Sequence, residues 1–154
     1  MTIPPDWTRW TYDARVLSVH DGDTMRVTID LGCGVAFTDN VRLLGIQCPE
    51  VGGAGVTADE KVAGGAARDR LRDLVYAAGD RVVVRTKKDA REGRGRYLAT
   101  VYAVWPDGMW TDLCQQLVDE GHATPYAGVG RAPKWTPEGL QQQPAMGSGG
   151  LCGW

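Results

Sequence analysis

Eight residues near the start of the chain, TMRVTIDL at 24–31, constrain the fold most strongly because apolar and polar side chains alternate along them. A period of two is that of a β-strand with one buried face, and it does not suit a helix. The apolar positions are Met25, Val27, Ile29 and Leu31. Turn sequences (DGD and LGCG) flank this run, and further β-rich runs lie at 14–20 and at about 40–46. The three runs predict a β-meander.

A helix is predicted between Thr57 and Gly79. Thr57 and Glu60 have the spacing of a capping box, and apolar residues then recur at helical period up to the glycine. The adjacent Gly64 and Gly65 each cost roughly 1 kcal/mol in a helix interior. We therefore expect the first turns of this helix to fray or break at the glycine pair.

The second half of the chain adds two strands and a helix. Strands are predicted at 81–86 and 97–105, and Thr111 begins a helix that Gly121 ends. The order of three strands, a helix, two strands and a helix fits a five-stranded Greek-key β-barrel of the oligonucleotide-binding (OB) type with two to three α-helices.

The predicted barrel domain occupies residues 14–127. Residues 1–13 form an N-terminal extension, and residues 128–154 form a C-terminal tail rich in Gly, Pro and Gln. A short third helix could begin at Leu140, but Pro144 limits its length.

The composition is that of an ordinary globular domain, with 43% apolar and 23% charged residues in 154. No stretch approaches the length of a membrane-spanning helix, and the N-terminus lacks a secretory signal, so we expect a cytoplasmic protein with no membrane association. The four cysteines form no CxxC pair and are expected to be reduced thiols.

The charge distribution is uneven although the net charge is only −2. Residues 81–96 hold seven basic and two acidic side chains, a net charge of +5, which leaves −7 on the rest of the chain. Such a separation can concentrate an anionic ligand on one face, although a solvated loop would carry the same charges. The small net charge argues against a general nucleic-acid coat protein, which would be basic.

Arg42 lies within an apolar run, VRLLGI. A guanidinium among apolar neighbours is costly unless a carboxylate or phosphate pairs with it, but an arginine facing solvent from the outer side of the strand would give the same pattern. Asp23 and Glu50, taken singly, are ordinary loop carboxylates. Together the three suit phosphodiester hydrolysis, which needs a hard cation on oxygen ligands, a group that activates water, and positive charge on the phosphorane.

Four blocks of sequence resemble the motifs of the staphylococcal nuclease (thermonuclease) family. They are VLSVHDGDTMRV, VRLLGIQCPE, GRYLATVY and LVDEGHATPY, and they occur in the family's order over about residues 14–126. The resemblance implies an OB barrel with three helices that cleaves DNA and RNA to 3′-phosphate products and uses one Ca²⁺, with Mg²⁺ or Mn²⁺ as possible substitutes. We expect single-stranded or frayed substrates, a monomer, and no protein partner.

The resemblance also implies roles for individual residues. Asp23 would bind calcium, and Glu50 would act as the general base or orient the attacking water. Arg42 and Arg96 would bind the phosphate, and Arg96 would also assist the leaving group. Further candidates for contacts with the substrate are Lys87, Arg94 and Tyr126.

Two positions depart from the family pattern, which has aspartate and threonine where this chain has Gln47 and Cys48. Cys48 keeps the backbone carbonyl that the family uses as a calcium ligand. The amide oxygen of Gln47 can also coordinate calcium, but the site loses one negative charge, and charge count controls calcium affinity. We therefore expect weaker calcium binding. The alternatives are a catalytically weakened module that binds nucleic acid or nucleotides, and a protein-interaction barrel with a vestigial site.

Overall fold

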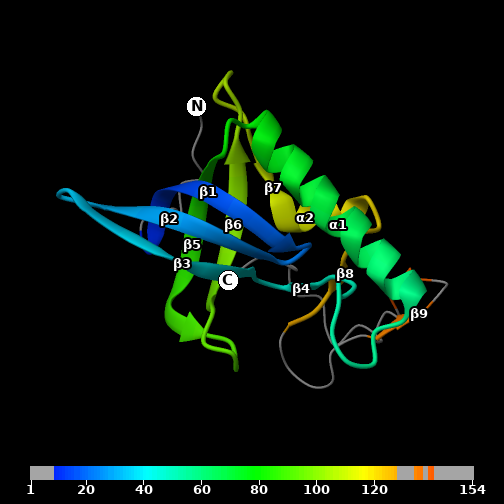
Figure 1. Ribbon diagram of the computed structural model, residues 1–154. Coiled ribbons are helices and arrows are strands. Elements are labelled where there is room, and N and C mark those ends of the chain that lie inside the picture. Colours follow the sequence, from blue (N-terminus) through cyan, green and yellow to red (C-terminus); the bar gives the residue numbers. More distant parts are fainter. Residues whose placement is uncertain (1–8, 128–133, 137–138, 141–154) are drawn as a thin grey trace.

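The computed structural model describes residues 9–127, 134–136 and 139–140, and within them five strands close into a β-barrel (Figure 1). Neighbouring strands are antiparallel in the order β3-β2-β1-β5-β6, and a parallel pairing of β3 with β6 closes the ring. The predicted five-stranded OB-type barrel with helices is confirmed. The strands are β1 (Thr11–Asp21), β2 (Thr24–Gly32), β3 (Val35–Leu43), β5 (Arg81–Arg91) and β6 (Tyr97–Val104).

Three strands are longer than the sequence pattern predicts. β1 begins at Thr11, where it pairs with Arg85, so residues 11–13 pair within the barrel. β5 continues to Arg91 and carries part of the basic segment into the sheet. β3 begins well before residue 40. Residues 35–38 are exposed, so they lack the alternation of buried and exposed positions on which a strand prediction depends.

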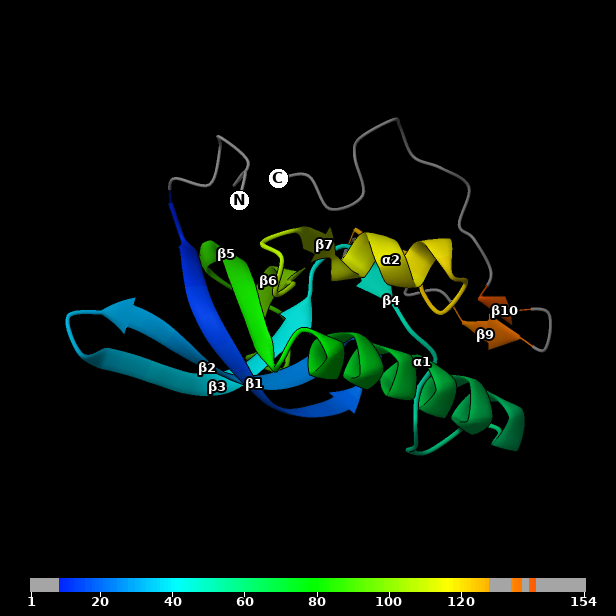
Figure 2. The ribbon, with the colours of Figure 1, turned by 90° about the horizontal axis from the view of Figure 1, so that it is seen from above.

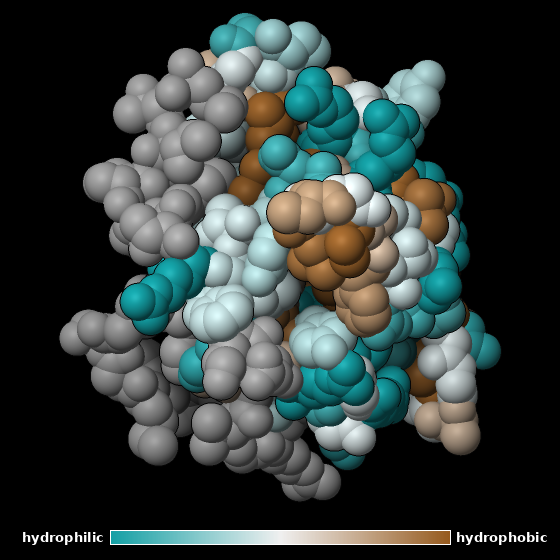
Figure 3. Space-filling view, turned by 90° about the vertical axis from the view of Figure 1, so that its left-hand side faces the viewer, coloured by the Kyte–Doolittle hydropathy of each residue, from teal (hydrophilic) through white to brown (hydrophobic). Residues whose placement is uncertain are grey.

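β2 and β3 extend beyond the barrel as a two-stranded ribbon (Figures 1 and 2). Its turn includes Gly32 and Gly34, whose φ angles of 79° and 75° favour glycine. Leu31 and Val35 flank the turn and are 46% and 53% exposed, and Figure 3 shows apolar surface among hydrophilic residues on this side. The other three apolar positions of the alternating run are buried, so the predicted alternation holds where β2 is part of the barrel wall.

Helix α1 (Ala58–Ala77) packs against β1 along one side of the barrel (Figure 2). Thr57 is its N-cap and accepts a hydrogen bond from the backbone N–H of Glu60 at 3.2 Å, as the capping pattern predicts. The expected break at Gly64 and Gly65 is wrong, because the helix continues through both residues. Larger side chains later in the helix pack into the core, and this packing outweighs the propensity cost of two glycines.

Helix α2 (Leu113–Asp119) begins two residues later than predicted. Thr111 belongs to β7 (Trp110–Asp112), which pairs with β6 at the edge of the barrel sheet. The N-cap is Asp112, whose Oδ1 accepts a hydrogen bond from the Gln115 backbone N–H at 3.1 Å. A carboxylate at the cap thus defines the start of the helix, while the threonine before it serves the strand.

Short strands complete the described residues. β4 (Ile46–Gln47) pairs with β8 (Thr124–Pro125), and β9 (Trp135–Thr136) pairs with β10 (Gly139–Leu140). The short helix considered for the tail falls on residues 141–154, outside the described part of the chain. Neither helix in the described part combines the length and the apolar character needed to cross a membrane.

A continuous apolar core fills the barrel and extends under both helices. Its largest fully buried side chains include Met25, Leu43, Ile46, Leu71, Leu113 and Leu117. Because these residues come from β2, β3, β4, α1 and α2, the core fixes the elements that surround the candidate site.

Replacing Leu71 with alanine should lower the free energy of unfolding by about 2–5 kcal/mol, because the side chain is 0% exposed and its loss leaves a cavity. Urea unfolding followed by circular dichroism measures the change. Tyr76→Ala on the same helix, at a residue that is 78% exposed, should change it by no more than about 0.5 kcal/mol. Equal losses in the two variants would show that α1 is not anchored through this face.

Candidate phosphate and metal site

A pocket of about 640 Å³ lies beside the C-terminal end of β3. Its walls come from the β1–β2 turn, the segment from β3 through β4, the β5–β6 loop and the residues that follow β8. The pocket brings together all but one of the predicted site residues: Asp23, Arg42, Gln47, Glu50, Lys87, Arg94, Arg96 and Tyr126. The remaining one, Cys48, is hydrogen-bonded to Asp23.

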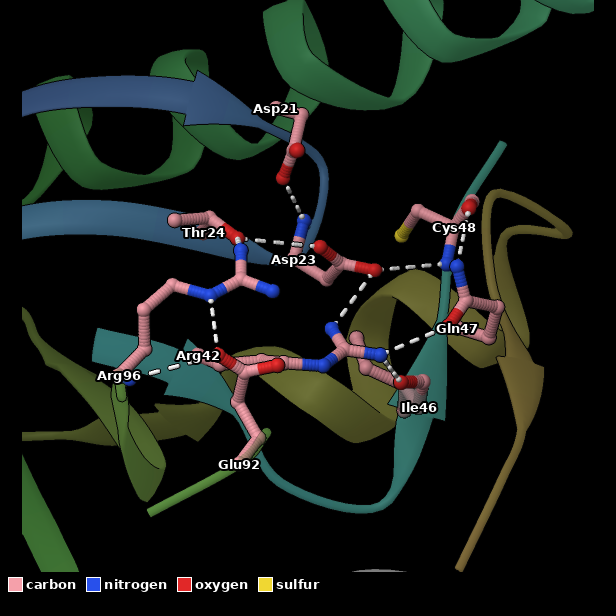
Figure 4. A network of polar contacts seen from close by, with 9 residues as sticks. All are labelled: Asp21, Asp23, Thr24, Arg42, Ile46, Gln47, Cys48, Glu92 and Arg96. Atoms are coloured by element: carbon pink, nitrogen blue, oxygen red, sulfur yellow. Dashed lines mark hydrogen bonds and ion pairs between the residues drawn. The ribbon is translucent and has the colours of Figure 1, made fainter. Parts of the chain in front are cut away.

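Arg42 is buried, with only 9% of its surface exposed, so the solvent-facing alternative is wrong. Its Nη1 lies 2.8 Å from Oδ2 of Asp23, and its Nη2 donates hydrogen bonds to the Ile46 carbonyl at 3.1 Å and to Gln47 Oε1 at 2.8 Å (Figure 4). The contact with Asp23 has the distance of an ion pair, yet none of the described residues gives the N–H groups of Nη1 an aligned acceptor. A buried arginine donor is therefore available to a further acceptor.

The β1–β2 turn places two buried carboxylates next to each other. Asp21 Oδ1 accepts a hydrogen bond from the Asp23 backbone N–H at 3.1 Å, and Asp23 Oδ2 accepts one from the Cys48 backbone N–H at 3.1 Å. Burial, and then the negative charge of Asp23, raise the pKa of Asp21 to about 7. The turn therefore holds more negative charge than its surroundings stabilise.

The Gln47 side chain joins Arg42 to the backbone of the next residue. Its Oε1 accepts from Arg42, and its Nε2 donates to the Cys48 carbonyl oxygen at 3.1 Å (Figure 4). An aspartate here could accept from Arg42, but it has no N–H to donate to the carbonyl. The Gln47 amide therefore donates a hydrogen bond to the Cys48 carbonyl oxygen, the atom that the family resemblance assigns as a calcium ligand.

Arg96 approaches the same turn from the β5–β6 loop. Its Nε donates to Glu92 Oε1 at 3.0 Å and its Nη1 to Thr24 Oγ1 at 2.6 Å, while the Thr24 hydroxyl donates to Asp23 Oδ1 at 3.2 Å. Hydrogen bonds from Arg96 lower the pKa of Glu92, so that carboxylate remains ionised. Thr24 also pairs with Arg42 across β2 and β3, which brings the two arginines to one turn (Figure 4).

Three side chains of this network, those of Asp21, Thr24 and Glu92, were given no role in the sequence predictions, and neither was the backbone carbonyl of Ile46. The signals were present in part: Asp21 opens the DGDT motif, and Glu92 precedes Arg96 by four residues. The roles of Thr24 and Glu92 depend on their hydrogen bonds with Arg96, which join β2 to the β5–β6 loop and which a single sequence does not reveal.

Glu50 is half-buried and lines the pocket, in the segment that follows Cys48. Burial, and then the charge of Asp23, raise the pKa of Glu50. Burial and the same charge raise the pKa of the Cys48 thiol, which is 2% exposed. A protonated, buried thiol is a poor nucleophile, so the structure favours only the backbone of Cys48 as a functional group.

The remaining predicted residues form the rim of the pocket. Lys87 is an exposed residue of β5, and Arg94 lies in the β5–β6 loop beside Arg96. Tyr126 follows β8, and its backbone N–H donates to the Gly45 carbonyl at 2.8 Å, which holds this segment against the other wall. Basic side chains and one aromatic ring thus surround an interior that is partly acidic.

The donor atoms at the centre of the site fit a hard divalent cation. Asp23 offers a carboxylate, and Gln47 and Cys48 offer an amide and a carbonyl oxygen, all of them ligand types that calcium and magnesium prefer. Burial raises the pKa of both Asp21 and Glu50, and the charge of Asp23 raises it further, although Arg42 lies beside Asp23. This unbalanced negative potential also favours a cation.

The same donors indicate weak binding. Within the described residues, no three His, Cys, Asp or Glu side chains gather as metal ligands, and the predicted ligands comprise one carboxylate and two neutral oxygens. Each of the three already has a hydrogen bond or ion pair within the protein. A cation would have to displace those contacts.

In the absence of divalent cations, the free energy of unfolding should fall as the pH rises from about 4 to about 7. The unfolded Asp21 carboxyl loses its proton near the ordinary pKa of 3.8, while the folded one keeps it to about pH 7, so the unfolded state binds fewer protons over this range. Asp21→Asn should therefore gain stability over the natural chain on the order of 3 kcal/mol at pH 8.

Urea unfolding in EGTA at several pH values tests this expectation. Asp13→Asn, at an exposed position of β1, is the matched control; because it keeps Asp21, its free energy of unfolding should fall with pH as that of the natural chain does. A gain for Asp21→Asn that does not change between pH 4 and pH 8 would contradict the raised pKa.

Comparison with protein-family models matches residues 40–144, more than half of the chain, to the staphylococcal nuclease homologues. A search of proteins with curated descriptions finds no match. The matched region begins after the DGDT motif, but the structure joins that motif to it through the contact of Asp23 with Arg42. A family domain on this barrel supports a nuclease-like or nucleic-acid-binding OB module. The chain belongs to the family of staphylococcal nuclease homologues.

Proposed function

We propose that this domain is a cation-dependent nuclease that hydrolyses phosphodiester bonds in DNA and RNA and leaves 3′-phosphate products. One observation carries the proposal above the others. Arg42 is buried at the pocket, and its Nη1 has no aligned acceptor among the described residues. A phosphate oxygen is the acceptor that best suits such a guanidinium.

The two arginines have complementary places in the proposed reaction. Arg42 reaches the pocket from β3 and Arg96 from the β5–β6 loop, and both converge on the turn that contains Asp23. A phosphate bound between them would receive charge-assisted hydrogen bonds from two directions. These bonds would strengthen as the phosphorane gains negative charge, which lowers the barrier to hydrolysis.

Glu50 is the proposed group that activates or orients water. Its raised pKa makes it a stronger base than an exposed glutamate, and its position in the pocket lining lets it reach a water beside the phosphate. Arg94 offsets part of the negative charge around it, since it lowers the pKa that burial and Asp23 raise.

Asp23, Gln47 and the Cys48 carbonyl would hold the cation, which we propose to be a single Ca²⁺, with Mg²⁺ or Mn²⁺ as possible substitutes. The bound ion would supply positive charge that stabilises the phosphorane. To take part, the Gln47 amide would present Oε1 to the ion and release the Cys48 carbonyl from its hydrogen bond.

The substrate is proposed to be single-stranded or frayed nucleic acid. The phosphate binds in a pocket beside a barrel strand, and a strand without a paired partner can bring its backbone into that pocket more readily than a duplex. Lys87 and Arg94 on the rim would contact neighbouring phosphates, and Tyr126 would contact a base or sugar.

The alternative function is a module that binds nucleic acid or nucleotides without cutting them. The Gln47 contacts favour it, because the amide side chain is hydrogen-bonded to both Arg42 and the Cys48 carbonyl. In that case the arginines would bind phosphate, and the loss of one ligand charge would leave cation affinity too low for catalysis.

The purified protein should cleave denatured DNA in Ca²⁺, and it should lose that activity in EGTA. Gel assays with denatured and plasmid DNA, each in Ca²⁺, Mg²⁺ or Mn²⁺, measure the cleavage. The double variant Arg42→Ala/Glu50→Ala is the background control. If the natural chain cuts no faster than this control with any ion, the nuclease proposal fails, and retained DNA binding would then support the binding module.

Gln47→Asp should tighten calcium binding about tenfold, because it restores a second ligand charge and frees the Cys48 carbonyl from the amide. Isothermal titration calorimetry measures the affinity, and cleavage at limiting calcium should rise in parallel. Gln47→Asn shortens the side chain without adding charge, and it should not produce the gain. Unchanged affinity in Gln47→Asp would show that residue 47 does not contact the ion.

A further inference from the structure

Two adjacent glycines in α1 have different surroundings, although their sequence context is almost the same. A Cβ built on Gly64 would lie 2.5 Å from the Glu50 carbonyl oxygen and 2.9 Å from the Pro49 carbonyl oxygen. A Cβ on Gly65 would meet only a side-chain nitrogen of Arg68, at 3.8 Å. Position 64 therefore excludes every side chain, whereas position 65 has room for one.

The atoms that press against Gly64 belong to the backbone, so they cannot rotate away as a side chain would. Glycine inside a helix costs about 1 kcal/mol relative to alanine, and α1 accepts that cost at a buried position. The close approach of the Pro49–Glu50 peptide gives a physical reason for a glycine at this place in α1.

Glu50 is bound to the same helix at a second point. Its backbone N–H donates a hydrogen bond to Oε1 of Glu60 at 3.3 Å. Glu60 and Gly64 are four residues apart and lie on one face of α1. The N–H of Glu50 is thus hydrogen-bonded to that face and its C=O packs against it, and the two contacts fix the point from which the carboxylate extends.

The same face of α1 holds the turn that contains the other carboxylates. A Cβ on Gly22 would lie 2.8 Å from the Ala67 Cβ and 2.8 Å from the Cys48 sulfur. Ala67 follows Gly64 by three residues and is fully buried. One strip of small residues therefore contacts both the DGDT turn and the Glu50 segment.

We propose that Gly64, together with Glu60, is a positioning residue that sets the place of the Glu50 carboxylate relative to Asp23 and the two arginines. The helix acts through the backbone of Glu50 and does not touch the substrate. The catalytic consequence rests on the proposed function, but the contact itself does not.

The test compares Gly64→Ala with Gly65→Ala. Gly65→Ala should keep the natural kcat and raise the melting temperature, because alanine favours the helix and fits the space. Gly64→Ala should lower kcat at least tenfold, measured at a temperature below the melting temperature of the variant. Its dissociation constant for a single-stranded oligonucleotide, measured in EGTA, should stay within twofold, because the arginines remain in place.

A second measurement does not depend on activity. In ¹H–¹⁵N spectra, the Glu50 amide resonance should shift in Gly64→Ala and stay near its natural position in Gly65→Ala. If the natural chain proves inactive, the proposed function fails while this comparison still decides whether Gly64 places Glu50. An unshifted Glu50 resonance in Gly64→Ala overturns the positioning role. Where the natural chain is active, an unchanged kcat in Gly64→Ala overturns it as well.

If Gly64→Ala does not fold, the Glu60 contact provides the equivalent test. Glu60→Ala removes the acceptor of the Glu50 N–H, whereas Glu60→Gln keeps an oxygen there. In Glu60→Gln the Glu50 amide resonance should stay near its natural position, and where the natural chain is active the variant should keep at least half of its kcat. In Glu60→Ala the resonance should move and kcat should fall below that level. Equal behaviour of the two variants overturns the proposal.

Discussion

The buried ion pair between Arg42 and Asp23 is the interaction on which the rest of the site depends. It joins the end of β3 to the β1–β2 turn at 2.8 Å, and in so buried a place neither charge is tolerated without the other. Asp23 also holds the backbone N–H of Cys48, so the pair fixes the start of the segment that leads to Glu50. On the proposed function a phosphate would recruit Arg42 and a cation would recruit Asp23. Each ligand alone would leave one member of the pair without its partner, so binding of either ligand is expected to raise the affinity for the other.

Two supports hold the groups on either side of this pair. Glu92 and Thr24 receive hydrogen bonds from Arg96, which keeps its guanidinium near the turn. On the other side, the small-residue strip of α1 lies against the DGDT turn and against the backbone of Glu50. Arg42 extends from a strand, whereas Asp23, Glu50 and Arg96 lie in turns and loops that are held by contacts with strands or with a helix. Such support is what a site that must place several charges around one phosphate requires.

The barrel could be predicted from residues whose environment is set locally. The alternation around Val27 and the capping pattern at Thr57 each reflect one strand or one helix, and both are present in the structure. The β2–β3 ribbon was underestimated because its far end has no buried face. The helix was wrongly predicted to fray or break at the glycine pair because the reason for a glycine at position 64 is its contact with the Pro49–Glu50 peptide, which is remote in sequence. The site residues in the motifs were predicted by resemblance, while the contact of Thr24 with Arg96 became visible only once β2, β3 and the β5–β6 loop were side by side.

The parallel pairing of β3 with β6 has a consequence for the order of folding. Val41 pairs with Tyr97, and all of α1 and β5 lies between them in the chain, so this contact is far less local than the hairpins of the meander. Contacts between distant residues form slowly, because the entropy of closing the intervening loop must first be overcome. Asp23 and Arg42 can meet within the early hairpins, whereas Arg96 reaches them only when the barrel closes. On the proposed function, recovery of phosphate binding during refolding would therefore mark the closure of the barrel and not the formation of its first strands.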